Sequence, residues 1–238
     1  MVTKQSPAII LNECASGAAS ASVVYPLPMT NCNVQFSINF GCITEAKADA
    51  IVCPANPLFS SSSWMYWRMG GAPPIIAWEA GYFTFEVAEE KARALIKTDG
   101  IKTENGMAFP LGYAIVTGPG WLKSPLNGII HVNIWSDDRN QIAYDSKAIE
   151  LSVIGALKAA DQEKLKSVAF PALGSEANLS GIAVSLQESL ISIMSGIENY
   201  FEGKASTQIE KVAVMIDAQP TFENAIKMLD ALNDILRK

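Results

Sequence analysis

The sequence predicts a three-layer α/β/α domain with a mixed, mostly parallel sheet. From about residue 141 onward, helical segments alternate with short hydrophobic strand segments, an order typical of parallel strands covered by helices on both faces. Hydrophobic residues make up 49% of the 238 residues, and charged residues make up 18%. A chain of this length and composition can bury a sizeable core in one domain.

Two hydrophobic segments predict the first strands of the domain. Val34, Phe36 and Ile38 alternate with polar residues, which indicates a half-buried strand. The apolar run within 48–53 predicts a buried strand, which Pro54 is expected to end. We expect these two strands to form a mixed edge of the sheet.

The other elements follow from the spacing of apolar residues and from Gly and Pro at the boundaries. The predicted helices span 64–69, 74–80, 83–97, 143–160, 179–200 and the end of the chain from Phe222 to Leu236. The predicted strands span 112–116, 128–135, 167–170 and 212–216.

The first 33 residues differ in composition from the rest of the chain. Residues 15–22 are all Ala, Ser or Gly, and Pro26 and Pro28 follow, which is a low-complexity pattern. We therefore predict an N-terminal extension over 1–33, either loose or lying along the domain surface. The rest of the chain, 34–238, is predicted to form one α/β domain.

Charge and cysteine content exclude several classes of function. The net charge of −6 disfavours nucleic acid and anionic membranes as partners, and no apolar run approaches the ~18 residues that span a bilayer. The short apolar stretch 8–11 ends too early for a signal peptide. No two of the four cysteines have C-x-x-C spacing, so we read them as free thiols in a reducing, cytoplasmic compartment.

Two loops follow strands and precede helices, where open α/β sheets bind their ligands. The first runs from Pro54 through Asn56 to the serines 60–63, and the second covers 171–178. Small residues in such loops allow backbone N–H groups to face an anion, above all where a helix begins. Ordinary turns are the alternative that these two segments leave open.

Several segments, in order, resemble the macro-domain family. Residues 40–44 and 48–56 look like its Gly-Asp-Ile-Thr and Asp-Ala-Ile-Val-Asn-Ala-Ala-Asn motifs. Residues 112–115 and 129–132 resemble its Gly-Tyr and Ile-Ile-His-Val strands. Residues 168–174, Val-Ala-Phe-Pro-Ala-Leu-Gly, resemble the run before its second phosphate loop.

This resemblance covers about 34–236 and implies a cleft for ADP-ribose, or a related nucleotide, at the strand ends. Some family members hydrolyse ADP-ribosyl esters or deacetylate O-acetyl-ADP-ribose, so it also implies a hydrolase and an ADP-ribosylated protein partner, with no cofactor. Asn56 is the one catalytic candidate, because the matching residue faces the distal ribose. The residues placed at the ligand are Cys42, Ile43, Asn56, Ser61, Ser62, Ser63, Gly174, Ser175, Glu176, Ala177, Asn178 and Phe222.

Several positions depart from the family pattern. Cys42 stands where the family has an Asp that accepts a hydrogen bond from the adenine amino group, and a thiol is a weak acceptor. Cys53 replaces an Asn, and the serines 60–63 replace glycines, although their hydroxyls could bond a phosphate. Residues 64–68 lack the carboxylate of hydrolytic members, and Glu176 would bring a negative charge near a pyrophosphate.

Other side chains admit two interpretations. His131 is the only histidine, and in an apolar strand it is more typical of structure than of catalysis. Cys42 or Cys53 as a nucleophile would need a base or a positive neighbour, which no motif supplies, and their spacing predicts no metal site. The aromatic residues within 64–67 pack under a helix or form a wall for a base. Phe222 stacks on adenine or packs in the core.

Three functions therefore remain open. The first is a binding module for ADP-ribose or a related nucleotide, in which any hydrolysis relies on groups of the substrate. The second is an enzyme of the same fold with an altered substrate, using the aromatic segment and Glu176. The third is a degenerate macro fold that binds no nucleotide and serves as an interaction or structural domain.

Overall fold

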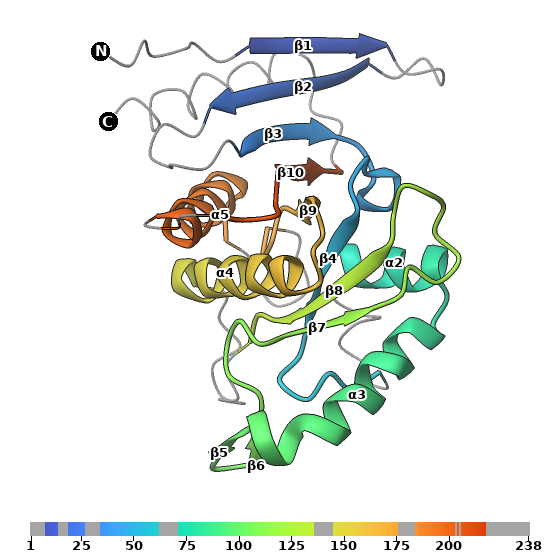
Figure 1. Ribbon diagram of the computed structural model, residues 1–238, viewed down its shortest axis with the longest axis vertical. Coiled ribbons are helices and arrows are strands. Elements are labelled where there is room, and N and C mark those ends of the chain that lie inside the picture. The colour runs from blue at the N-terminus through green and yellow to red at the C-terminus, as the bar shows by residue number, and fades with distance from the viewer. Residues whose placement is uncertain are drawn as a thin grey trace.

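The computed structural model centres on an eight-stranded sheet with the order β1-β2-β3-β10-β9-β4-β8-β7 (Figure 1). The structure describes residues 8–13, 19–26, 34–61, 71–135, 145–175, 184–202, 204 and 206–217. The strands of the sheet are β1 (Ala8–Glu13), β2 (Ala19–Pro26), β3 (Gln35–Phe40), β4 (Ala50–Ala55), β7 (Ala114–Thr117), β8 (Gly128–Asn133), β9 (Ser167–Pro171) and β10 (Lys211–Ile216). A separate small hairpin pairs β5 (Ile101–Thr103) with β6 (Gly106–Ala108).

The predicted mixed, mostly parallel sheet is confirmed. The five adjacent strands β3, β10, β9, β4 and β8 run parallel, whereas β1, β2 and β7 pair antiparallel with their neighbours. The prediction that the first two domain strands form the mixed edge is wrong, because β4 lies in the middle of the sheet between β9 and β8. A strand whose residues 50–53 are all buried suits a central position rather than an edge.

Helices cover both faces of the sheet, as Figure 1 shows. The helices are α2 (Ala72–Ala80), α3 (Phe83–Asp99), α4 (Ser146–Gln162) and α5 (Leu186–Phe201), with a short 3₁₀ helix η1 (Ile43–Glu45). Alternate residues of β4 serve the two faces: Ala50 and Val52 join the core under α4 and α5, while Ile51 and Cys53 join the core under α2. Among the described helices, none is both long and apolar enough to cross a membrane.

The segment predicted as an N-terminal extension contains two strands. The strands β1 and β2 pair antiparallel, and β2 also pairs with β3, so that they extend the sheet on that side. The apolar residues 8–11 of β1 are consecutive, and β2 begins with the Ala- and Ser-rich run. Neither segment shows the hydrophobic alternation typical of a half-buried strand, and for that reason the sequence did not indicate them. The division of the chain at residue 33 stays a prediction.

Strands β4 and β9 are joined at their amino ends and separate towards their carboxyl ends. Only Ala50↔Val168 and Ile51↔Ala169 pair across them. At the joined end, the Asp49 carboxylate accepts the N–H groups of Lys166 and Ser167 at 2.7 and 3.1 Å. The backbone N–H of Asp49 donates to the hydroxyl and carbonyl oxygens of Ser167 at 2.8 and 3.1 Å.

Proline prevents the separated ends from pairing. The strand β4 continues through Pro54 to Ala55, beyond the predicted end, because it stays paired with β8. The carbonyl of Ala55 accepts from Ile134 on that side, so by the alternation of backbone groups along a strand Pro54 faces the β9 side. Proline has no N–H to donate there, and the carboxyl ends of the two strands remain apart.

We expect Asp49→Ala to lower the free energy of unfolding by about 2 kcal/mol, because it removes the acceptor of two backbone N–H groups. Urea denaturation measures this change. The control Glu104→Ala removes an exposed carboxylate in the turn between β5 and β6, and its effect should stay within about 0.5 kcal/mol. Equal effects of the two substitutions would show that the Asp49 carboxylate does not hold β4 against β9.

Asp161, near the end of α4, binds α5 and the segment that leads to β10. Its Oδ2 accepts from the Tyr200 hydroxyl at 2.7 Å and from Lys204 Nζ at 2.8 Å. Its Oδ1 accepts from the Thr207 hydroxyl at 2.7 Å and from the Gln208 N–H at 2.9 Å. Burial raises the pKa of this carboxyl, but the four hydrogen bonds outweigh burial and lower the pKa to about 2.

This lowered pKa makes part of the stability dependent on pH. Ionised Asp161 contributes stability that is complete above the unfolded-state pKa of about 4 and is lost as the pH falls through about 2. We expect Asp161→Asn to lower the free energy of unfolding by about 2 kcal/mol at pH 7 and by less than about half of that at pH 2.5. Urea denaturation at both pH values, with the exposed Glu163→Gln as control, tests this. A loss of equal size at both would contradict the assignment.

Candidate functional site

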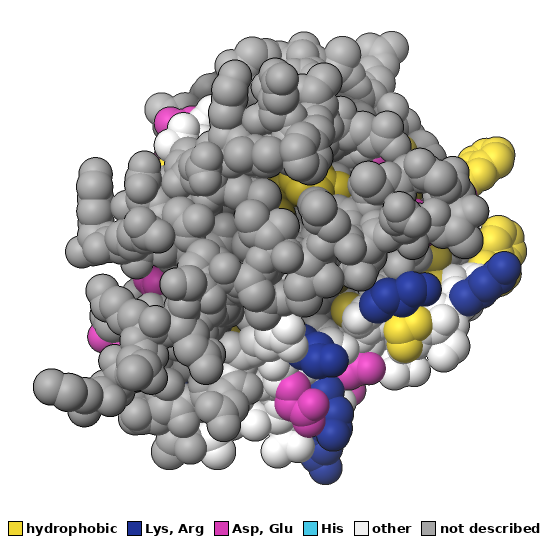
Figure 2. All heavy atoms as spheres, turned by 90° about the horizontal axis from the view of Figure 1, so that it is seen from above, with side chains coloured by type: hydrophobic (Ala, Val, Ile, Leu, Met, Phe, Trp, Pro, Cys, Tyr) yellow, Lys and Arg dark blue, Asp and Glu magenta, His cyan; other side chains and the backbone are white. Residues whose placement is uncertain are grey.

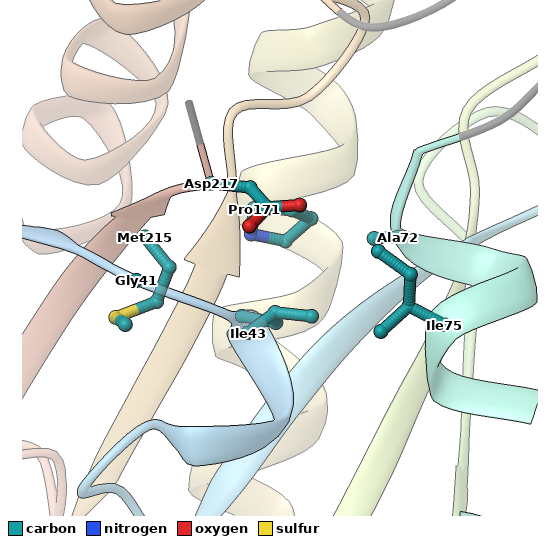
Figure 3. A pocket seen from close by; sticks show the side chains of 7 residues that line it. All are labelled: Gly41, Ile43, Ala72, Ile75, Pro171, Met215 and Asp217. Atoms are coloured by element: carbon teal, nitrogen blue, oxygen red, sulfur yellow. The ribbon is translucent and has the colours of Figure 1, made fainter. Parts of the chain in front are cut away.

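A pocket lies at the carboxyl ends of β3, β10 and β9, beside the first turn of α2 (Figure 3). It is a shallow surface pocket, and the space between its lining atoms amounts to about 230 Å³ when the adjoining solvent is included. Its lining residues are Gly41, Ile43, Ala72, Ile75, Pro171, Met215 and Asp217. This is the edge of the sheet at which open α/β folds place their ligands.

The walls of the pocket are apolar. Ile43, Ala72 and Met215 are at most 7% exposed, and the ring of Pro171 and the side chain of Ile75 complete the lining. Gly41 has a φ of 140°, a conformation that residues with a side chain rarely adopt, so the backbone of this wall has no side chain of its own. Such surfaces suit a flat, weakly polar ring.

Among the described residues that line the pocket, Asp217 is the only ionisable one. Figure 3 shows its carboxylate above Pro171, turned towards the space that Ala72 and Ile75 of α2 border from the other side. A carboxylate at this place favours a hydrogen-bond donor or a cation and repels a phosphate.

The side chain of Asn56 organises the loop after β4. Its Oδ1 accepts the N–H groups of Leu58 and Ser60 at 2.9 and 3.1 Å, and its Nδ2 donates to the Ser60 carbonyl at 3.2 Å. Phe59, between them, has a positive φ of 53° and its ring packs edge-on against Phe109 at 5.4 Å. The Asn56 amide, the predicted catalytic candidate, thus holds a tight turn and is 8% exposed.

Ser61 is the predicted phosphate-binding serine that lies within the described residues, and it is bonded to α3. Its N–H and its hydroxyl both donate to Glu89 Oε2, at 2.8 and 2.6 Å. The hydrogen bond from the Ser61 hydroxyl is the largest of the influences that lower the pKa of Glu89, and Arg93 also contributes. The hydroxyl of Tyr82 donates to the Ser61 carbonyl at 2.7 Å. A carboxylate of the protein therefore occupies the two donors that were expected to bond a phosphate.

The second predicted loop begins with a tight turn after β9. Gly174 has a φ of 79°, and the N–H and hydroxyl of Ser175 both donate to the Ala172 carbonyl, at 3.2 and 2.8 Å. The N–H of Val184 donates to the Gly174 carbonyl at 3.2 Å, so both ends of this loop meet at Gly174. Predicted site residues outside the described part of the chain are Ser62, Ser63, Glu176, Ala177, Asn178 and Phe222. The aromatic segment 64–67 and Arg68 also lie outside it.

His131 is a buried structural residue of β8. Its Nε2 lies 3.1 Å from the Thr117 hydroxyl oxygen, and its ring packs edge-on against Phe85 at 5.1 Å. Burial and, to a lesser extent, the charge of Lys91 lower its pKa to about 3, so the ring is neutral near pH 7. These contacts agree with the structural interpretation of this residue.

The two described cysteines are free thiols and differ in their surroundings. Cys53 is fully buried in the core under α2, and burial raises the pKa of its thiol. Cys42 is half-buried, and its Sγ lies 3.1 Å from the Thr44 hydroxyl oxygen. Among the described residues, no three His, Cys, Asp or Glu side chains are grouped to hold a metal ion.

Large aromatic side chains are exposed elsewhere on the surface. Trp78 and Trp121 are 81% and 71% exposed, and the ring of Phe83 packs edge-on against Trp121 at 5.6 Å. None of these three residues lines the pocket. Figure 2 shows hydrophobic side chains that protrude at one side of the face drawn there, next to Lys and Arg side chains.

Of the predicted ligand-binding residues, Ile43 lies in the pocket lining. Sequence reasoning did not select Ala72, Ile75, Met215 or Asp217, and it quoted Gly41 and Pro171 only as parts of motifs. Asp217 could have been found, because it directly follows the last predicted strand, at the edge where ligands bind.

An open, mostly parallel sheet with helices on both faces and a pocket at the carboxyl ends of its strands defines an α/β protein of the open-sheet class. The family model described as Macro domain matches residues 86–184. The fold of the chain is the macro-domain fold.

Two relatives come from Pyrococcus species. An uncharacterized protein of Pyrococcus abyssi is 27% identical over 205 residues, which cover 82% of this chain and 97% of the relative. An uncharacterized protein of Pyrococcus horikoshii is 31% identical over 150 residues, which cover 58% of this chain and 67% of the relative.

Solved structures with the same fold include macrodomains named with bound nucleotides. The Oceanobacillus iheyensis macrodomain with ADP superposes with a TM-score of 0.63 at 19% identity. The superposition covers 92% of this chain and 100% of that macrodomain. The Trypanosoma brucei macrodomain in complex with ADP-ribose gives 0.55 at 15% identity, over 83% and 68% of the two chains. At these identities, the likeness establishes the fold.

We expect an alkylating reagent to modify Cys42 of the folded protein at least about tenfold faster than Cys53, because Cys53 is buried and its raised pKa suppresses the reactive thiolate. Peptide mass spectrometry after timed exposure to iodoacetamide at pH 8 measures both rates. The same experiment in urea is the control, in which the two rates should converge. Equal rates in the folded protein would contradict the burial of Cys53.

Proposed function

We propose that the protein binds ADP-ribose or a related nucleotide, with the base in the pocket at the ends of β3, β10 and β9. The observation that carries this proposal is the apolar pocket with one acceptor group at that edge of a macro-domain fold. The macrodomains with ADP or ADP-ribose, named above, support a nucleotide as the ligand class.

The charges around the pocket suit the base rather than the phosphates. Asp217 would repel a phosphate, and the first turn of α2 has few donors because Pro73 and Pro74 carry no N–H. The free N–H groups that normally attract anions to a helix start are therefore reduced here. We place the phosphates outside the pocket, towards the loop that starts at Gly174.

Hydrolysis is the subordinate part of the proposal. The catalytic candidate Asn56 already makes three hydrogen bonds within its own loop, and an amide does not exchange a proton with water as a general base does. Any turnover of ADP-ribosyl or O-acyl-ADP-ribose substrates would then depend on groups of the substrate itself. The corresponding partner is an ADP-ribosylated protein. The free thiols Cys42 and Cys53 favour the cytoplasm as the compartment.

We expect isothermal titration to give micromolar or tighter affinity for ADP-ribose, about −8 kcal/mol or better, with AMP and NAD as comparators. The substitution Ile75→Trp should weaken this affinity at least about tenfold, since a larger side chain fills the pocket. Trp78→Ala is the matched control on α2, because Trp78 is exposed and does not line the pocket.

Three results are informative. Lost binding in Ile75→Trp with full binding in Trp78→Ala supports the pocket as the site. Unchanged binding in a folded Ile75→Trp variant moves the site elsewhere. If wild-type protein gives no heat with millimolar ADP-ribose, the proposal fails, and the degenerate macro fold with an interaction role is favoured instead.

A further inference from the structure

The residues that follow β3 and β10 leave the sheet side by side. Phe40 pairs with Ile216 at the last position of the parallel ladder between these strands, and the N–H of Gly41 donates to the Ile216 carbonyl at 3.0 Å. By this register Asp217, which follows Ile216, is level with Gly41, and Cys42 follows Gly41 one residue later. Positions 42 and 217 therefore both follow strand ends at the same edge of the sheet.

The side chains at these two positions differ as hydrogen-bond acceptors for a ligand. The Cys42 thiol lies 3.1 Å from the Thr44 hydroxyl oxygen, does not line the pocket and is a weak acceptor. The Asp217 carboxylate lines the pocket and points into it, as Figure 3 shows. Within the described part of the chain, Asp217 makes no ion pair and no hydrogen bond, so its oxygens remain available to a ligand.

We propose that Asp217 is the specificity-determining residue of this pocket and that its carboxylate accepts a hydrogen bond from the exocyclic amino group of a purine base. This inference rests on the proposed nucleotide binding. The acceptor that the family resemblance places at position 42 is thereby supplied from the neighbouring strand end.

The chemistry of the pocket selects an aminopurine. An ionised carboxylate only accepts hydrogen bonds, so it favours an amino group and disfavours a ring carbonyl at the same place. The apolar side chains of Ile43, Ile75 and Met215 cover a ring but offer no competing donor or acceptor. A bound ring would cover the exposed Asp217 carboxylate, and a ligand without the donor would then leave it unpaired and bind more weakly.

The test compares ADP-ribose with the analogue in which hydrogen replaces the 6-amino group of the base. We expect wild-type protein to prefer ADP-ribose by about tenfold, the size of one charge-assisted hydrogen bond. In Asp217→Ala, this preference should fall to about one. Removal of the negative charge of Asp217 also changes its repulsion of the phosphates, which are the same in both ligands. This effect changes both dissociation constants equally, so their ratio is the readout.

Two control variants separate this role from other effects. Glu45→Gln removes an exposed negative charge close to the pocket from a residue that does not line it, and it should keep the wild-type preference. Cys42→Ala should also keep it. Asp217 is exposed at a strand end, so its variant is expected to fold, and circular dichroism checks this.

The possible outcomes distinguish the inference from the function on which it rests. If both ligands bind and the preference survives Asp217→Ala, the inference is overturned while nucleotide binding stands. If the preference is lost in Cys42→Ala instead, position 42 carries the selectivity and the inference is again overturned. If wild-type protein binds neither ligand, the proposed function fails, and the inference fails with it.

Discussion

The divergence of β4 from β9 is the constraint on which the rest of the site depends. The Asp49 carboxylate fixes the start of β9 to the start of β4, and two residue pairs later the ladder ends. Pro54 offers no N–H on the β9 side, so the two strands cannot close the gap with further hydrogen bonds. The carboxyl end of β9, with Pro171, is thereby left to line the pocket with the ends of β3 and β10.

The loop after β4 is held in shape by hydrogen bonds within the protein. The Asn56 side chain makes three hydrogen bonds to the backbone of this loop. Ser61, further along the loop, is bonded to Glu89 of α3. These bonds fix the loop, so the proposed binding of a nucleotide would cost less conformational entropy. The same bonds use the polar groups of Asn56 and Ser61 that the resemblance would assign to a ribose or a phosphate, and the two roles compete.

The sequence predicted what depends on local pattern and missed what depends on strand order. Alternation in 34–38 and the apolar run in 48–53 placed two strands correctly, and the motif around Ile43 led to the pocket. Met215, Asp217 and Ile75 belong to segments distant in the chain, and only the register of β10 against β3 and the position of α2 bring them together. The short apolar run of β1 and the Ala- and Ser-rich start of β2 carry no alternation signal. The extra length of β4 beyond Pro54 depends on its pairing with β8.

The positions of the two carboxylates, Glu89 and Asp217, indicate how a nucleotide would lie in this fold. Glu89 is already satisfied by Ser61 and Arg93, whereas Asp217 faces the pocket. A dinucleotide-like ligand has donors on its base and negative charge on its phosphates, so the base end fits beside Asp217 and the phosphates are driven away from it. With two prolines in the first turn of α2, that helix start is a poor second choice for the phosphates. In the proposed binding mode, the phosphates would therefore point towards the turn at Gly174 and Ser175, which follows β9.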